Sequence, residues 1–229
     1  MEREEDKDFD TLPVIGFKKE LIKSIQNNQI VICIGETGSG KTTQIPQFCL
    51  DFNLVPSDKK IAITQPRRVA AVTVAERVSQ ERGQKVGEEV GYSIRFDDRT
   101  SSTTRIKFMT DGILVRECLY DSTLSKYQVI MLDEAHERSI HTDVLFGLLK
   151  MICSKRSDLK LIIASATLDT QKFSSYFNNC PVITIPGRVF PVDIYHSKTK
   201  QVMTVHGPAT NTYVISAADI VMQIHSVEV

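Results

Sequence analysis

The 229-residue chain has no excess of charge of either sign, because 28 lysines and arginines balance 28 aspartates and glutamates. A protein that attracts nucleic acid through a basic overall field is therefore excluded, and any such contact must come from a local patch. No run approaches the ~18 consecutive apolar residues of a membrane-spanning helix. The first ten residues, MEREEDKDFD, lack the apolar core of a signal peptide. We expect an intracellular protein without a membrane partner, and a flexible charged leader over residues 1–11.

Cysteine is sparse, and its five positions are widely separated, odd in number and without a C-x-x-C pair. This spacing argues against a zinc site and a disulfide framework, and it is typical of reduced thiols in an intracellular protein. The sequence also lacks internal repeats and low-complexity tracts. Its length allows one large or two small domains with a sizeable core.

Four short apolar runs alternate with helical patterns along the chain. They are IVICI (30–34), KIAIT (60–64), QVIML (128–132) and LKLIIAS (159–165). Such runs predict an α/β fold with a mostly parallel sheet and helices on both faces. Two further runs, VGYSIRF and TRIKFM, predict additional strands.

Two apolar stripes at helical spacing predict helices that pack on this sheet. One precedes the first strand, and the other follows the second strand and is closed by Gly83. We expect the stripe residues to be core residues without a chemical role: Phe17, Leu21, Ile22, Ile25, Val69, Val72, Ala75 and Val78.

The chain after residue 196 has a different character from the segment before it. Residues 197–212 contain few large apolar residues and read as a linker. The following YVISAADIVMQIH has helical spacing. We therefore predict one α/β domain over residues 12–196, and over 197–229 a linker and the first helix of a further, absent domain.

A glycine-rich loop, GETGSGKTT at residues 35–43, follows the first predicted strand and fits the pattern G-x-x-x-x-G-K-S/T. Its glycines permit backbone N–H groups to point inward and to bind phosphate at a helix N-terminus. Lys41 would reach the β and γ phosphates, and the Thr42 hydroxyl would bind Mg²⁺. A glycine-rich turn without a ligand is the alternative. The candidate nucleotide-binding residues are Gly35, Glu36, Thr37, Gly38, Ser39, Gly40, Lys41, Thr42 and Thr43.

Two neighbouring acids, Asp133 and Glu134, directly follow the apolar run at 128–132. An acidic pair after a strand can simply begin a solvated loop or a helix. Beside a phosphate loop, however, one acid is needed to hold Mg²⁺ and another group to act near the γ-phosphate. A cation also offsets the cost of burying two carboxylates. We predict that Asp133 holds the metal and Glu134 acts as base or positioning group.

The motifs GETGSGKT, TQPRRVAA, TDGIL, DEAH and SAT occur in the order and approximate spacing of the DEAH-box RNA helicases of superfamily two. Over residues 12–229 the chain resembles the first RecA-like lobe of such an enzyme, and its last helix resembles the first element of the second lobe. The resemblance implies a RecA-like P-loop fold, ATP and Mg²⁺ as cofactors, and single-stranded RNA as a partner.

The resemblance also assigns roles in hydrolysis. It implies that Glu134 activates the attacking water, and that His136, Ser165 and Thr167 couple hydrolysis to movement between lobes. Arg77 matches an arginine that stacks on adenine, which predicts loose base selectivity. A lone histidine is ordinarily a surface or core residue, and His136 has no partners at metal-ligand spacing, so we reject a zinc role.

Four residues match positions that contact the RNA backbone in this family: Arg67, Arg68, Arg95 and Thr110. Guanidinium and hydroxyl donors at strand ends can bind phosphate and sugar without reading sequence. Each has a simpler alternative, because PRR before a helix is often a solvated turn and a threonine before Asp-Gly is usually a cap.

The function that the resemblance implies is an ATP-dependent RNA helicase that moves along single-stranded RNA and remodels ribonucleoprotein complexes. The alternatives are a P-loop ATPase that acts on protein complexes without nucleic acid, and a nucleotide-binding module without activity of its own. Because the second lobe supplies catalytic arginines, we expect this chain to bind ATP but to hydrolyse it slowly and not to unwind RNA.

The pathway is only weakly indicated. The segment ERSIHTDVLFGLLK resembles the pre-mRNA splicing and nucleolar members of the family. We expect a role in pre-mRNA splicing, with ribosome assembly left open as the alternative. For the full-length protein the resemblance implies a nuclear location and a glycine-rich activator protein that binds its C-terminal domains.

Overall fold

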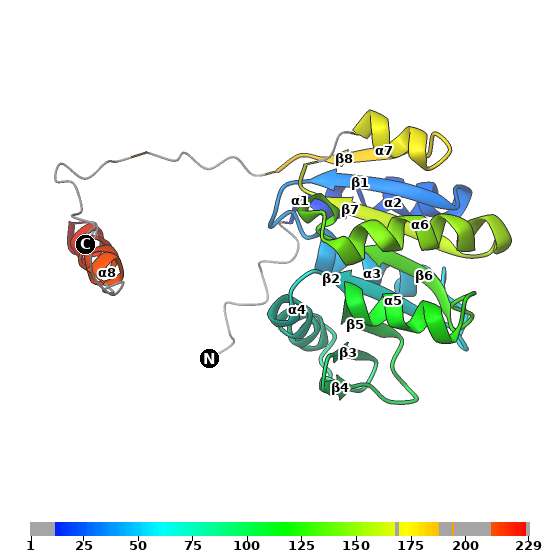
Figure 1. The fold of residues 1–229 in the computed structure, drawn as a ribbon, viewed down its shortest axis with the longest axis horizontal. Helices are drawn as coiled ribbons and strands as arrows, with labels where there is room; N and C mark the ends of the chain where they lie inside the picture. Colours follow the sequence, from blue (N-terminus) through cyan, green and yellow to red (C-terminus); the bar gives the residue numbers. More distant parts are fainter. Residues whose placement is uncertain (1–11, 168–169, 188–193, 195–211, 228–229) are drawn as a thin grey trace. The chain divides into compact units, whose positions relative to one another are not determined.

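The computed structural model describes residues 12–167, 170–187, 194 and 212–227 (Figure 1). The chain divides into two units, residues 1–188 and 189–229. The leader predicted over residues 1–11 and almost all of the linker predicted over 197–212 lie outside the described residues. In the second unit, the predicted C-terminal helix is present as α8 (Thr212–Val227).

The first unit is built on an eight-stranded sheet with the strand order β4-β3-β5-β2-β6-β7-β1-β8. All neighbouring strands pair in parallel except β3 and β4, which are antiparallel. The predicted α/β fold with a mostly parallel sheet is thus confirmed. The strands are β1 (Ile30–Gly35), β2 (Lys60–Gln65), β3 (Val90–Ile94), β4 (Asp97–Arg99), β5 (Ile106–Thr110), β6 (Tyr127–Leu132), β7 (Lys160–Ser165) and β8 (Val182–Ile185).

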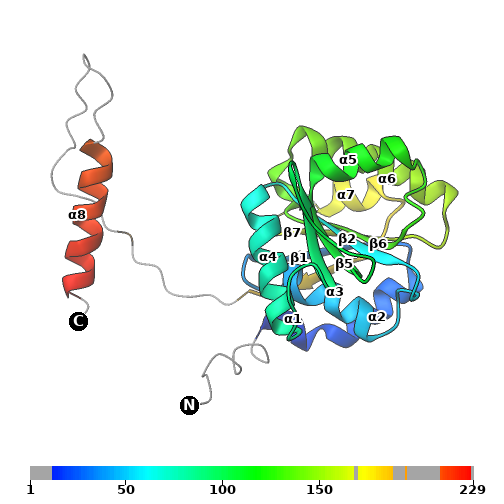
Figure 2. The ribbon, with the colours of Figure 1, turned by 90° about the horizontal axis from the view of Figure 1, so that it is seen from below.

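Helices cover both faces of the sheet, as predicted (Figure 2). One core lies between the sheet and α2, α3 and α4, and the other lies between the sheet and α5, α6 and α7. Side chains alternate along each strand, so that Val31 and Cys33 enter the first core while Ile30 and Ile32 enter the second. The helices are α1 (Pro13–Gly16), α2 (Lys18–Asn27), α3 (Lys41–Asp51), α4 (Arg68–Glu81), α5 (Asp111–Tyr120), α6 (Ile140–Lys155) and α7 (Thr170–Tyr176), with the 3₁₀ turn η3 (Ala135–Glu137).

The helical stripe predicted over residues 69–78 is wrong at its first position. Ala75 and Val78 are buried in α4, but Val69 is 77% exposed. The stripe advances in steps of three residues, and a helix turns about 100° per residue, so the stripe drifts about 180° between Val69 and Val78. A residue at each end cannot face the same core.

The five cysteines are all free and buried. Burial raises the pKa of Cys33 and of Cys49 to about 12, so both are protonated thiols at neutral pH. Among the described residues, no helix is long and apolar enough to cross a membrane.

The parallel register brings the carboxyl ends of seven strands to one edge of the sheet. In spatial order these are β3, β5, β2, β6, β7, β1 and β8. Within this row Thr110 at the end of β5 pairs with Gln65 at the end of β2. The motifs that the sequence singled out follow these strand ends, so the topology brings them to a common edge.

Two glycines offer a matched test of this packing. A Cβ atom at Gly91 in β3 would lie 2.2 Å from the backbone carbonyl oxygen of Arg99 in β4, whereas a Cβ at Gly147 inside α6 would meet no atom within 4 Å. Gly91→Ala is expected to destabilise the chain by about 1–3 kcal/mol through overpacking. Gly147→Ala is expected to stabilise it by about 0.5–1 kcal/mol through helix propensity. Urea unfolding measures both changes, and equal effects would contradict the β3–β4 pairing.

Candidate functional site

The loop between β1 and α3 adopts a conformation that requires glycine. Gly38 and Gly40 have φ angles of 82° and 90°, in the left-handed region. A Cβ atom at Gly40 would also lie 2.8 Å from Cγ1 of Val14, because α1 packs behind the loop. The Val14 backbone N–H donates a hydrogen bond to the Ser39 carbonyl oxygen at 3.1 Å. The N-terminal residues thus support the predicted phosphate loop directly.

Lys41 is buried and folds back onto this loop. Its Nζ donates to the carbonyl oxygens of Gly35 and Glu36, the latter at 2.8 Å, and to the Ser39 Oγ at 3.1 Å. Burial lowers the pKa of Lys41, and the negative charge of Asp133 opposes this shift. An anionic ligand in the loop can compensate this buried ammonium group better than neutral oxygens do.

Asp133 lies at the end of β6 and is 2% exposed. The Thr42 hydroxyl and the Gln65 amide both donate to its Oδ2, the latter at 2.6 Å, and the Glu134 N–H donates to its Oδ1 at 2.9 Å. Burial raises the pKa of Asp133, whereas these hydrogen bonds and the charge of Lys41 oppose the rise.

Thr42 and Asp133 are the residues that could hold a metal ion, because their oxygen atoms lie in contact. Oxygen ligands suit hard divalent cations such as Mg²⁺, which usually bind one or two protein groups plus phosphate oxygens and water. Among the described residues there is no cluster of three or more histidines, cysteines or acids that could form a metal site by itself. Thr42 and Asp133 would by themselves supply only part of such a coordination shell.

Glu134 has an unusual backbone, with φ 51° in the left-handed region although it is not glycine. Such a residue stores strain, and strained residues are concentrated at functional sites. Its side chain is half-buried. Burial first, and the negative charge of Asp133 second, raise the pKa of Glu134.

His136 in η3 connects Glu134 to the end of β7. Its Nε2 lies 3.4 Å from Glu134 Oε2, and its Nδ1 accepts a hydrogen bond from the Ala166 backbone N–H at 3.3 Å. Because Nδ1 is an acceptor, the proton of the neutral ring lies on Nε2 and faces Glu134. The Ser165 Oγ also lies 3.3 Å from Nδ1 and donates to the Thr167 carbonyl oxygen at 2.9 Å. The structure thus joins all three predicted coupling residues to Glu134.

A cavity of about 280 Å³ collects most of the predicted nucleotide-binding residues. Arg77 of α4, predicted to stack on adenine, lines the same cavity as the phosphate loop and Glu134. Leu12 and Glu81 also line it and were not predicted as site residues. The lining residues are Leu12, Thr37, Gly38, Gly40, Lys41, Thr42, Thr43, Arg77, Glu81 and Glu134.

A second cavity, of about 350 Å³, collects three of the four residues predicted to contact RNA. Arg68, Arg95 and Thr110 line it, and Arg116 and His141 add two groups that sequence reasoning missed. Arg116 lies one helical turn after the Asp-Gly of the TDGIL motif, so helical spacing could have indicated it. The other lining residues are Pro66, Asp111, Gly112, Ile113 and Ser139.

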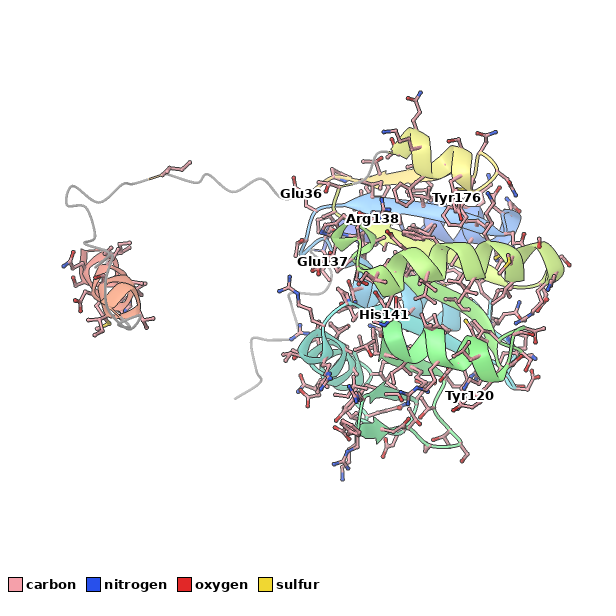
Figure 3. All side chains as sticks on the ribbon, viewed as in Figure 1. Glu36, Tyr120, Glu137, Arg138, His141 and Tyr176 are labelled. Atoms are coloured by element: carbon pink, nitrogen blue, oxygen red, sulfur yellow. The ribbon has the colours of Figure 1, made fainter. Side chains whose placement is uncertain are left out.

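Arg67, the fourth predicted RNA residue, does not line this cavity. Its Nη2 donates to Glu137 Oε1 at 3.1 Å, in the turn that follows the two acids. Figure 3 shows Glu137 and Arg138 at the same edge of the sheet as Glu36 of the phosphate loop, away from Tyr120. Arg67 therefore joins the end of β2 to residues 133–137, the acidic loop that follows β6.

The two cavities divide the edge of the sheet between them. Residues after β3, β5 and β2 line the second cavity together with Ser139 and His141, which follow β6. Residues after β1 line the first cavity together with Glu134 after β6 and with Arg77 and Glu81 of α4. The strands β2 and β6 are neighbours at the boundary. There the Gln65–Asp133 and Arg67–Glu137 contacts connect the two halves.

Comparison with known proteins places the chain beside helicases. The model of the DEAD/DEAH box helicase family matches residues 17–174. Over 214 residues the chain is 55% identical to the pre-mRNA-splicing factor ATP-dependent RNA helicase prp22 of Schizosaccharomyces pombe. The alignment covers 93% of this chain but only 18% of that relative, so the chain spans less than a fifth of its length.

The raised pKa of Glu134 predicts that its ionised carboxylate destabilises the folded chain at neutral pH. In the unfolded chain Glu134 titrates near its ordinary value of 4.5, and in the folded chain it titrates above that value. The folded state therefore holds more protons between these two pKa values, and stability falls as pH rises through that window. Glu134→Gln removes the ionisation and is expected to unfold at a higher urea concentration than the parent at pH 7.

The difference should shrink as pH falls below 4.5, where the parent carboxyl is protonated in both states. Glu20→Gln is the control, because Glu20 is exposed on α2. A Glu134→Gln variant that is less stable than the parent at pH 7 would contradict the claim that the ionised Glu134 carboxylate destabilises the folded chain.

Proposed function

Because the chain belongs to the DEAD/DEAH box helicase family, we propose that it is the ATP-binding, RecA-like lobe of a DEAH-box RNA helicase. One observation supports this proposal above the others. A cavity lined by the phosphate loop and a basic cavity lie on one sheet edge and are joined by Gln65–Asp133 and Arg67–Glu137. A helicase needs such a connection between nucleotide and nucleic acid, whereas an ATPase that acts on protein complexes alone does not need the second cavity.

Members of the family bind ATP. We assign the phosphates to the loop and to Lys41, and Mg²⁺ to the oxygens of Thr42 and Asp133. The hydrogen bond between these two residues supports the assignment, because it places two suitable oxygens side by side. When bound, Mg²⁺ would neutralise charge on the phosphates and make the buried Asp133 carboxylate favourable.

Glu134 is suited to accept the proton of the attacking water. Its raised pKa lies above that of an ordinary glutamate, which strengthens the carboxylate as a base. The Nε2 of His136 lies 3.4 Å from Glu134 Oε2 and would orient the carboxylate. Through Ala166, Ser165 and Thr167, the same histidine would pass changes at the phosphates to the end of β7.

The second cavity supplies the groups for RNA. Arg68 and Arg95 would bind phosphates, and the Thr110 hydroxyl would bind phosphate or sugar. Arg67 would have to leave Glu137 to reach RNA. Because these donors read no base edge, we expect binding without sequence preference.

The relative's printed name supports a role in pre-mRNA splicing, and with it a nuclear location and a ribonucleoprotein partner. We further propose that a glycine-rich activator binds parts of the full-length protein outside this chain, and that α8 is the first helix of the second lobe. The apolar side chains of α8, such as Ile215 and Met222, are 62% and 66% exposed and would be buried there.

The chain by itself is expected to bind ATP with Mg²⁺, to hydrolyse it slowly and not to unwind RNA duplexes. Catalytic arginines from a second lobe are worth about 10³ to 10⁵ in rate. Calorimetry measures ATP binding, with Lys41→Ala as the variant that is expected not to bind. A turnover assay with and without single-stranded poly-RNA measures the rate of ATP hydrolysis. Strong RNA-stimulated turnover that Glu134→Gln abolishes would contradict the need for the second lobe.

Filter binding of poly-RNA tests the second cavity in the same preparation. Arg95→Ala should weaken RNA binding and reduce the slope of affinity against salt by about one. Arg99→Ala is the matched control, since Arg99 is exposed on β4 and does not line the cavity. Equal losses in both variants would mean that RNA binds elsewhere, and no RNA binding by the parent would favour an ATPase without a nucleic-acid partner.

A further inference from the structure

Glu81, at the end of α4, is a buried carboxylate that the proposed reaction does not use. Its side chain is only 7% exposed. Charged groups are rarely buried unless hydrogen bonds or opposite charges compensate them. Here Gln44 and Gln47 donate to Oε2 at 2.8 and 2.7 Å, and the Nε of Arg77 donates to Oε1 at 3.0 Å.

The two oxygens of Glu81 therefore contact two different elements. Oε2 is held by side chains of α3, the helix that begins at Lys41 directly after the phosphate loop. Oε1 holds Arg77, one helical turn earlier on α4. Glu81 and Arg77 both line the cavity of the phosphate loop.

Arg77 needs such a partner if it is to stack on a base. Its side chain is 49% exposed, and a long exposed side chain samples many rotamers. Nε lies at the base of the planar guanidinium, so a hydrogen bond to Nε restricts the orientation of the whole plane. A stacking contact depends on that orientation, whereas a simple attraction between charges does not.

We propose that Glu81 is a positioning residue for the nucleobase: it fixes the plane of Arg77 relative to the phosphate loop. This inference rests on the proposed ATP site. Gln44 and Gln47 hold the carboxylate from α3, so the distance between the base subsite and the phosphate subsite is set by the packing of α3 against α4. A ligand without a base makes no use of this arrangement.

The test compares two ligands in calorimetry of the 229-residue chain, Mg²⁺–ATP and Mg²⁺–tripolyphosphate. Glu81→Gln and Arg77→Ala are each expected to weaken ATP binding roughly three- to tenfold and to leave tripolyphosphate binding unchanged. The double variant should bind ATP no more weakly than Arg77→Ala, because both changes remove the same contact. Ser79→Ala, a buried change in the same helix that leaves Arg77 and Glu81 in place, is the control.

If Glu81→Gln weakens both ligands equally, Glu81 only joins α3 to α4 and the proposal is overturned. Arg77→Lys, an exposed change, keeps the test valid if Glu81→Gln does not fold. The lysine side chain retains the positive charge but has no planar guanidinium, so Arg77→Lys should weaken ATP binding as much as Arg77→Ala does. If Arg77→Lys binds ATP with the affinity of the parent, the proposal is overturned. Failure of the proposed ATP site would give a different result: Lys41→Ala would bind both ligands with the same affinity as the parent chain.

Discussion

The candidate site depends on one buried carboxylate, that of Asp133. Its two oxygens accept hydrogen bonds from two residues that are distant in sequence, Thr42 after the phosphate loop and Gln65 at the end of β2, and from the backbone of the adjacent Glu134. Burial alone makes this charge unfavourable, as its raised pKa shows, and the surrounding donors and Lys41 only partly offset it. A bound cation would complete the compensation, in line with the proposed metal–nucleotide site.

The parallel sheet turns this local arrangement into a link between two cavities. The strands β2 and β6 are neighbours, so their carboxyl ends place Gln65 beside Asp133 and Arg67 beside Glu137. Arg68, the next residue of the same turn, lines the basic cavity. The four residues 65–68 thus contact Asp133, the loop that carries Glu134, and the proposed RNA path. The left-handed backbone of Glu134 shows that the acidic loop is itself under strain.

The parts of this structure that the sequence predicts are those with a local signal. The glycine pattern of the phosphate loop and the apolar runs of the strands depend on neighbouring residues, and both are found where predicted. The hydrogen-bond partners of Asp133 and Arg67 could not be predicted from the sequence, because they depend on the order of the strands in the sheet. The strand β4 consists of three charged residues and carries no apolar signal, since its pairing uses the backbone. The contact between Arg77 and Glu81 could have been predicted from the sequence, because the two residues lie four positions apart on one helix.

The most direct measurement is a crystal structure of the chain with ADP and Mn²⁺ in place of Mg²⁺, read through the anomalous signal of manganese. We predict manganese between the Thr42 hydroxyl and the Asp133 carboxylate, with Lys41 Nζ moved from the carbonyl oxygens of Gly35 and Glu36 to a phosphate oxygen. ADP bound in the loop with the Thr42–Asp133 hydrogen bond intact and manganese elsewhere would contradict the role of Asp133.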